Sequence, residues 1–296
     1  MEGQDERNIL NLLFVTFLAM KKKLICLLIA CLLVLTSCEY FGDDFWNGIL
    51  SDVAEEVSRA FIDITDEQST PTYSRDENWR TRPFAVSKNL STPPPTDERL
   101  FDLNTALDYI VLNGNKPYFD TSSLLANDFM LLSEFDDLGR CGMAISCLSL
   151  NTMPTEKRDS PRYNPTGWKS VQYDGKYLYN RSHLLGFQLT GDSSTPENLI
   201  TGTRHFNTQS MIKLENQVAS YIKKSGNHVT FRVTPVFYKN ELLARGVIME
   251  AYSVEDKGKG ICFCVFVRNI QPGIIIDYAT GESIQEEMSR AESKAA

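Results

Sequence analysis

The chain has 296 residues and a formal net charge of -8, with 42% hydrophobic and 23% charged residues. This composition is typical of a globular protein, and the sequence has no fixed-period repeat, which excludes solenoids and propellers. Net acidity argues against a polyanionic partner for the chain as a whole, but the charge is uneven. From Cys38 to Asp137, 7 lysines and arginines stand against 20 aspartates and glutamates, whereas from Leu138 to Ala296 19 stand against 15. The C-terminal half is therefore compatible with a nucleic-acid partner.

The N-terminal residues have the pattern of an export signal. Three lysines at 21–23 precede an apolar run over 24–35 and then small residues. This order is typical of a secretory signal, so we expect a leader over 1–37 whose true start is Met20. A single membrane helix over 9–35 is the alternative, but it would bury the three lysines.

Residues 35–38, Leu-Thr-Ser-Cys, resemble a bacterial lipoprotein box. The resemblance implies that Cys38 is lipidated and that the exported protein is anchored to a membrane or reaches the extracellular space. Residues 44–63 follow, with apolar side chains at helical spacing, and predict an amphipathic helix. Polar residues and prolines over 64–99 predict a linker that holds a catalytic domain away from the membrane.

The region 100–284 is predicted to be the folded domain, and residues 285–296 are predicted to be a disordered tail. A strand and turn are expected at 109–114, a buried strand at 142–150 and a further strand at 177–179. A helix is expected over 208–224, followed by three strands with short connections, which favours an antiparallel meander. Strands combined with a few inserted helices indicate the α+β class, an antiparallel sheet with flanking helices. The three last strands cover 229–238, 243–252 and 260–267.

The cysteines do not indicate a zinc site, because the chain has no Cys-x-x-Cys pair and only three histidines. Cys141 and Cys147 could pair, but the sequence leaves this open. Cys262 and Cys264 are two residues apart in a predicted strand, so both should point to the same face as small buried residues.

Arg181 and His183 carry the first chemical signal. They lie two residues apart where a strand gives way to a loop, so alternation should place both side chains on one side of the sheet. A neighbouring guanidinium opposes a proton on the imidazole, and arginine can hold a phosphate through a bidentate fork. A neutral base beside an anion-binding group is suited to phosphodiester hydrolysis.

Residues 180–183, Asn-Arg-Ser-His, together with Asn198, Asn207 and Glu215, resemble the DNA/RNA non-specific endonuclease family, the His-Me or ββα-metal finger nucleases. The resemblance extends over about 106–283 and is closest to secreted bacterial DNases and DNA-entry nucleases. The four residues match the family's Asp-Arg-Gly-His motif, with Asn180 and Ser182 as departures. Asn180 removes a negative charge beside the site.

The resemblance implies an antiparallel sheet that carries a ββα-metal finger, and a nuclease that holds one Mg²⁺, or Mn²⁺, through Asn207 and waters. His183 would be the general base, Glu215 would orient a metal-bound water or fix the finger, and Arg181 would stabilise phosphate charge. The products would carry 5′ phosphates. The implied substrate is DNA, with RNA as a further candidate, and no protein partner is expected.

Each assignment has a structural alternative. His183 could be a satisfied core or surface histidine, Asn207 a helix N-cap, and Glu215 part of a solvated helix face. Arg181 could pair with an acidic neighbour. The remaining candidates are Asn198 as an orienting residue, Arg140 and Arg204 as phosphate contacts, His205 as structural or DNA-facing, and Trp168 as core rather than a stacking platform.

At the level of the whole protein, the alternative to an endonuclease is a degenerate lipoprotein that binds DNA at the surface without cutting it. A secreted antibacterial toxin nuclease is a third hypothesis. Lipidation at Cys38 disfavours the toxin, because it would retain the protein on its own membrane.

Overall fold

The structure is a computed structural model that describes residues 79–80, 88–96, 98–101 and 107–286. The predicted leader, Cys38, the predicted helix over 44–63 and most of the predicted tail lie outside the described residues. Within the described ranges, no helix is long and apolar enough to cross a membrane. The elements, in chain order, are α3 (Lys88–Ser91), η1 (Glu98–Phe101), β1 (Tyr109–Val111), η2 (Asn113–Asn115), β2 (Phe129–Leu132), β3 (Ala144–Leu148), β4 (Gln172–Tyr173), β5 (Lys176–Tyr177), β6 (Tyr179–His183), α4 (Phe187–Thr190), η3 (Pro196–Asn198), β7 (Leu199–Thr203), η4 (Phe206–Met211), α5 (Ile212–Ser225), β8 (Val229–Val236), β9 (Gly246–Ser253), β10 (Cys262–Arg268), β11 (Ile274–Ile276) and β12 (Ser283–Gln285).

A six-stranded sheet in the order β1-β10-β9-β8-β3-β2 forms the centre of the fold, and each neighbouring pair is antiparallel. The α+β class is confirmed, and β8, β9 and β10 are the predicted antiparallel meander. These strands form because they are rich in apolar and β-branched residues, which are buried on both faces of the sheet. In β9, Val247, Met249 and Ala251 face one side of the sheet, while Ile248 and Glu250 face the other.

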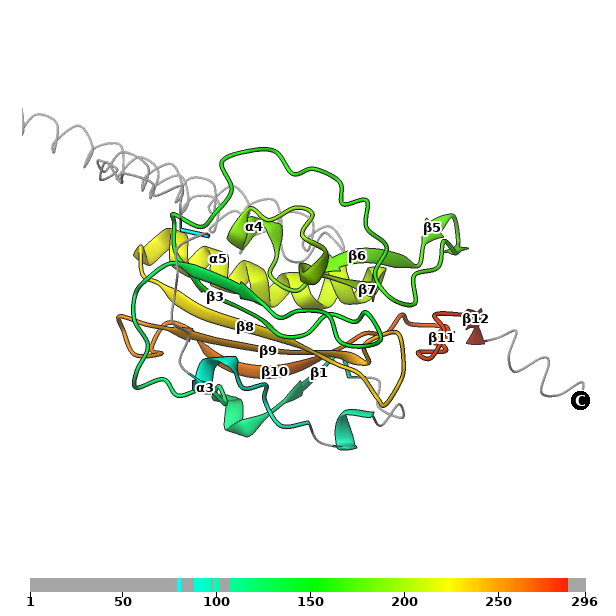
Figure 1. The fold of residues 1–296 in the computed structure, drawn as a ribbon, viewed down its shortest axis with the longest axis horizontal. Coiled ribbons are helices and arrows are strands. Elements are labelled where there is room, and N and C mark those ends of the chain that lie inside the picture. The colour runs from blue at the N-terminus through cyan, green and yellow to red at the C-terminus, as the bar shows by residue number, and fades with distance from the viewer. Residues whose placement is uncertain (1–78, 81–87, 97, 102–106, 287–296) are drawn as a thin grey trace, which may run out of the picture. The chain divides into compact units, whose positions relative to one another are not determined.

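Helices α4 and α5 lie on one side of the sheet in Figure 1, together with the paired strands β6 and β7, and α3 lies on the other side. The larger core lies on the α5 side, where Val218 and Ile222 of α5 are buried with Phe231 and Val265 of the sheet. This arrangement places a strand pair and a following helix against one face of the sheet.

The opposite face is covered by residues upstream of β1 and by residues 118–119. A buried ion pair joins Arg232 of β8 to Glu250 of β9, with Nε–Oε2 at 2.6 Å. The same guanidinium donates to the carbonyl oxygens of Leu90 and Thr92. Because a buried charge needs partners, this pair ties residues 90–92 to the sheet.

Two apolar side chains of the predicted linker over 64–99 are buried. The side chain of Trp79 is 3% exposed and that of Leu90 is 6% exposed, and Leu90 packs in a cluster with Phe119 and Ile145. The polar and proline-rich composition of residues 64–99 gave no indication that these two apolar side chains are buried.

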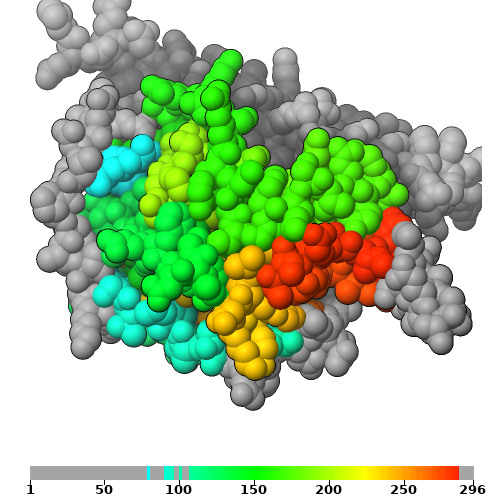
Figure 2. Space-filling view, turned by 45° about the vertical axis from the view of Figure 1, so that its right-hand side comes forward, coloured from blue at the N-terminus to red at the C-terminus, as the bar shows by residue number. Residues whose placement is uncertain are grey.

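Two short hairpins lie at one end of the molecule, where Figure 2 shows the red atoms of β11 and β12 against green atoms of earlier residues. Lys169 Nζ lies 2.6 Å from Glu282 Oε1, and the hydroxyls of Tyr173 and Ser283 are 2.9 Å apart. These contacts hold the β4–β5 hairpin, which leads directly into β6.

The four described cysteines, Cys141, Cys147, Cys262 and Cys264, are free. Cys141 is buried in the core on the α5 side and Cys147 in a cluster on the other face, so the disulfide that the sequence left open does not form. Burial raises the pKa of each of these two thiols to about 12, which makes both unreactive.

Candidate active site

Strands β6 and β7 and the helical segment after them form a ββα unit that collects the candidate residues. His183 is the last residue of β6 and pairs with Leu199, the first residue of β7. After β7 the chain turns into a helix whose first part, η4, is π-helical and whose second part is α5. The unit brings His183, Asn207 and Glu215 to one cavity of about 390 Å³, within the range of ligand pockets.

His183 is 5% exposed, and both ring nitrogens have partners. Nε2 lies 3.1 Å from the carbonyl oxygen of Ser193, and Nδ1 lies 3.1 Å from Nη2 of Arg158. A carbonyl oxygen can only accept and a guanidinium can only donate. The neutral ring therefore carries its proton on Nε2 and has its lone pair on Nδ1.

Burial, and secondly the guanidinium of Arg158, lower the pKa of His183 from 6.5 to about 4. The cation that lowers this pKa is therefore Arg158, and not Arg181 as predicted from the sequence. Arg158 lies on the exposed loop between β3 and β4, and no local pattern marks it, so sequence reasoning missed it.

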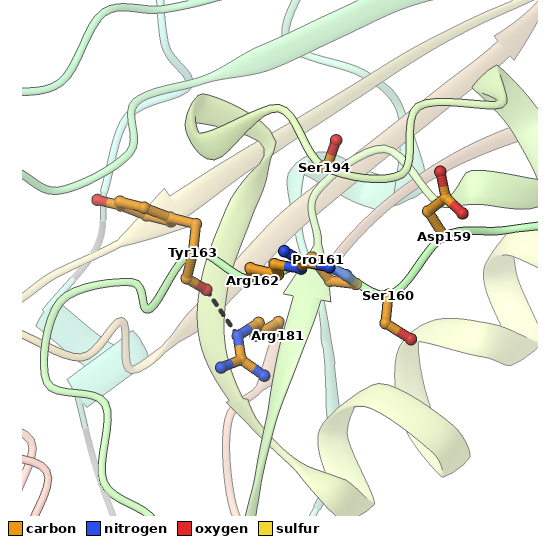
Figure 3. A pocket seen from close by; sticks show the side chains of 7 residues that line it. All are labelled: Asp159, Ser160, Pro161, Arg162, Tyr163, Arg181 and Ser194. Carbon is orange, nitrogen blue, oxygen red and sulfur yellow. Dashed lines mark hydrogen bonds between the residues drawn. The ribbon is translucent and has the colours of Figure 1, made fainter.

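Arg181 lines two hollows next to the cavity of His183. Its Nε donates to the carbonyl oxygen of Tyr163 at 2.6 Å, as Figure 3 shows, and Nη2 donates to Oδ1 of Asn164 at 2.5 Å. The guanidinium also lies 4.4 Å above the ring of Trp168. Arg181 thus holds the loop before β4, and it has no acidic partner among the described residues. Trp168 packs with the cluster around Tyr179, as expected for core.

Asn207 is the second residue of η4, and its side-chain amide has no hydrogen-bond partner among the described residues. The N-cap alternative is wrong, because the helical residues begin at Arg204 and the side chain that caps them is Thr203, whose Oγ1 accepts from the backbone N–H of Phe206 at 3.1 Å. π-helical segments occur often at functional sites. An unpaired amide at a cavity is available for a ligand.

Glu215 is 7% exposed, which contradicts the alternative of a solvated helix face. Its carboxylate lies against the backbone of Gly186, and Nε2 of Gln188 is 3.4 Å from Oε2. Burial raises the pKa of Glu215 from 4.5 to about 7, although Gln188 and Arg158 oppose the shift. A buried carboxylate with so few donors fits a site that receives a cation.

Asn198 is fully buried and orients the loop after His183. Its Oδ1 accepts from the backbone N–H of Leu185 at 2.9 Å, and its Nδ2 donates to Leu185 O and to Oδ2 of Asp192. Asp192 precedes Ser193, whose carbonyl accepts from the imidazole. The predicted orienting role of Asn198 is therefore supported by contacts that lead through Asp192 and Ser193 to His183.

Arg140 and His205 lie outside the cavity. Arg140 donates to Asp136 and to the carbonyl oxygens of Lys239 and Glu241, so the structure places it in a turn rather than at a phosphate site. His205 contacts Asp108 at 2.9 Å. Arg204 and Asn207 line the same hollow. Arg204 therefore remains a candidate for a phosphate contact.

Among the described residues, no group of three or more His, Cys, Asp or Glu side chains could hold a metal ion. The side chains with oxygen atoms at the cavity are one carboxylate, Glu215, two amides, Asn207 and Gln188, and the hydroxyl of Thr208. Such a set suits a hard cation that keeps most of its water molecules, because few protein ligands are needed.

Gly186 is required by the close approach of Glu215. A Cβ atom at this position would lie 2.6 Å from Oε2 of the carboxylate. We expect Gly186→Ala to lower the free energy of unfolding by about 1–3 kcal/mol, as overpacking does, and to displace the carboxylate. Thermal melts should show the same substitution costing less in a Glu215→Ala background, where the clash is gone. Equal costs in the two backgrounds would contradict the contact.

The lowered pKa of His183 predicts a pH-dependent stability. The unfolded chain binds a proton at pH 6.5, whereas the folded protein binds it only near pH 4. Stability should therefore fall as the pH drops from 6.5 to 4, by up to about 3 kcal/mol. The measurement is urea unfolding of the metal-free protein against His183→Gln. Glu215 titrates in both proteins, so its contribution cancels when the two free energies of unfolding are subtracted. If the remaining difference did not depend on pH, the imidazole of His183 would not be buried and neutral.

Part of this chain matches a known protein family, and its fold is similar to solved structures. Residues 121–255 match the family model described as DNA/RNA non-specific endonuclease. The structure of NucA from Streptococcus agalactiae with magnesium ion bound is similar at 22% identity and a TM-score of 0.53, covering 60% of this chain and 86% of NucA. The Sda1 nuclease with bound zinc ion is similar at 25% identity and a TM-score of 0.51, covering 60% of this chain and 97% of Sda1.

The fold and the family match define an enzyme that acts on nucleic acids. Residues 121–255 are a domain of the DNA/RNA non-specific endonuclease family.

Proposed function

We propose that this chain hydrolyses phosphodiester bonds of DNA without sequence preference, with His183 as general base and a divalent cation, Mg²⁺ or Mn²⁺, as cofactor. The observation that carries the proposal is the shared cavity of His183, Asn207 and Glu215. RNA is the second substrate to test. The similar structures with magnesium and with zinc support a divalent cation without selecting one.

The protonation state of His183 suits a base. Nε2–H is held by the Ser193 carbonyl, so Nδ1 is the atom that takes a proton from the attacking water. The lowered pKa keeps Nδ1 unprotonated at neutral pH. Arg158 contacts this nitrogen from an exposed loop and can swing to a phosphate oxygen, which frees Nδ1 for the water.

Asn207 and Glu215 would hold the cation, the amide oxygen directly and the carboxylate directly or through water. When bound, the cation would supply charge stabilisation at the scissile phosphate and at the leaving 3′ oxygen, so that products carry 5′ phosphates. Arg181, as it is placed here, orients the loop that borders the cavity and presents one edge of its guanidinium to the neighbouring hollow.

Plasmid digestion tests the proposal. Purified protein should degrade the plasmid with Mg²⁺ or Mn²⁺ and leave it intact with EDTA, and end labelling should reveal 5′ phosphates. Parallel reactions with single-stranded DNA and RNA define the substrate range. A protein that shifts DNA on a gel yet cuts none of these substrates between pH 6 and 9 would replace the enzyme with the surface DNA-binding alternative.

A groove of arginines supports binding through phosphates. Connected hollows around the cavity are lined by Arg158, Arg162, Arg181 and Arg204. We expect Arg204→Gln to raise KM equally for unrelated sequences and to reduce the slope of log affinity against log salt by about 1. Arg140→Gln, outside the groove, should lower Tm and leave the slope unchanged. A sequence-dependent change with Arg204→Gln would contradict readout by phosphates.

We also propose that the protein is exported and anchored through a lipid on Cys38. The Leu-Thr-Ser-Cys sequence and the apolar run before it support this proposal. Labelled fatty acid should be incorporated into the wild type and not into Cys38→Ser. Incorporation into both proteins would refute the anchor site.

A further inference from the structure

Residues 79 and 80 lie on the catalytic side of the molecule, upstream of the family domain. The side chain of Trp79 is 3% exposed, and the guanidinium of Arg80 lies 5.2 Å above the same indole ring. Nη2 of Arg80 donates to the carbonyl oxygen of Thr190, the last residue of α4. In Figure 1 the short cyan piece formed by these residues lies beside α4. This contact joins the N-terminal segment to the backbone around the cavity.

Helix α4 needs such a contact because it has four residues. A single turn has little stability of its own, and its last carbonyl groups have no partner within the helix. The hydroxyl of Thr152 donates to Leu189 O, and Arg80 donates to Thr190 O. Gly191 makes room for the arginine, because a Cβ atom there would lie 2.9 Å from Nη2 of Arg80.

A short path of bonds leads from Arg80 to the imidazole of His183. The hydroxyl of Thr190 accepts from the backbone N–H of Asp192 at 3.2 Å, and Asp192 is held by Asn198. The next residue, Ser193, accepts from Nε2 of His183. Only two residues, Gly191 and Asp192, therefore separate the carbonyl that Arg80 binds from the carbonyl that fixes the histidine proton.

We propose that Trp79 and Arg80 are positioning residues that fix the segment from Thr190 to Ser193 and thereby the tautomer and orientation of His183. Residues 79–80, upstream of the family domain, are then a working part of the enzyme, although they touch neither substrate nor cation. This inference rests on the proposed role of His183 as general base.

The test compares Arg80→Met, which removes the donor at similar length, with Arg80→Lys, which restores a donor. Lys224→Met, at the exposed end of α5, is the control for loss of one positive charge. We expect Arg80→Met to lower kcat about tenfold with KM within twofold, because small misplacements of a catalytic group cost rate rather than binding. Arg80→Lys should recover most of the rate, and the control should match the wild type.

A second readout does not depend on activity. The chain has three histidines, so ¹⁵N-histidine spectra of the metal-free protein are readily assigned with single variants. His183 should show one neutral tautomer, with the proton on Nε2, in the wild type and in Arg80→Lys, and a mixture of tautomers in Arg80→Met. If the wild type is inactive, the proposed function fails, while the spectra still decide the positioning role.

Several outcomes would overturn the inference. Unchanged kcat and an unchanged tautomer in Arg80→Met would exclude positioning. A rise in KM alone would assign Arg80 to substrate binding, and an equal loss of rate in a His183→Ala background would show that it does not act through the histidine. Unfolding of Arg80→Met at the assay temperature would assign the segment to global stability instead.

Discussion

Replacing His183 by alanine should lower kcat for plasmid cleavage by about 10²- to 10⁴-fold, the usual contribution of a general base. The reason is geometric: Nδ1 is the basic atom that the Ser193 carbonyl leaves unprotonated, and it contacts Arg158, which lines the same cavity as Asn207 and Glu215. KM should change little, because a buried imidazole contributes little to holding the phosphate backbone. The measurement is initial rates at saturating DNA.

His228→Ala is the matched control for His183→Ala. His228 contacts Glu255 through Nδ1 at 2.6 Å, and it does not line the cavity. The control should keep wild-type kcat, even if its melting temperature falls. A His183→Ala variant that folds and cuts within threefold of the wild type would remove this residue from the base role and direct attention to Glu215.

Asn207→Ala should produce the second large effect. We expect a loss of about 10²- to 10³-fold in rate at low Mg²⁺, because the cation's stabilisation of the transition state is worth several kcal/mol and each factor of ten corresponds to about 1.4 kcal/mol. The loss should shrink as Mg²⁺ is raised. Asn207→Asp keeps an oxygen donor, so it should need less added metal than Asn207→Ala.

Gln209→Ala controls for the loss of an amide in the same helical segment. Gln209 is exposed and does not line the cavity, so its removal should leave the Mg²⁺ titration unchanged. Direct calorimetry of Mg²⁺ binding separates metal affinity from chemistry. Equal Mg²⁺ affinity for Asn207→Ala and the wild type would show that the amide does not hold the cation.

The sheet was predictable from sequence where apolar residues formed long runs. The apolar pattern of 229–238, 243–252 and 260–267 predicted β8, β9 and β10, since a strand that packs on both faces needs bulky residues at each position. Strand β7 was missed, because its five residues, Leu-Ile-Thr-Gly-Thr, lie inside the motif and include a glycine, which is depleted in strands. Its faces are buried by tertiary contacts: Ile200 packs in the core on the α5 side, and Thr201 Oγ1 donates to the carbonyl oxygen of Thr166.

The cavity was predictable only in part. His183, Asn207 and Glu215 were found through their spacing, and the structure brings them together. Arg158 could not be found in the same way, because the long loop that carries it has no periodic pattern and its direction is decided by tertiary packing. Trp79 was missed for a similar reason: one apolar residue in a polar segment gives no signal of burial.

The π-helical segment η4 also decides the rotational phase of the helix. Asn207 and Glu215 are eight residues apart, and in a regular α-helix that separation leaves two side chains about 80° apart around the axis. A π turn takes up one additional residue, so eight positions act as about seven, close to two full turns. Both donor groups therefore project from nearly the same line on the helix. By the same geometry, deleting one residue from the exposed turn between them, such as Gln209, would convert it to α-helix and leave the two donors aligned.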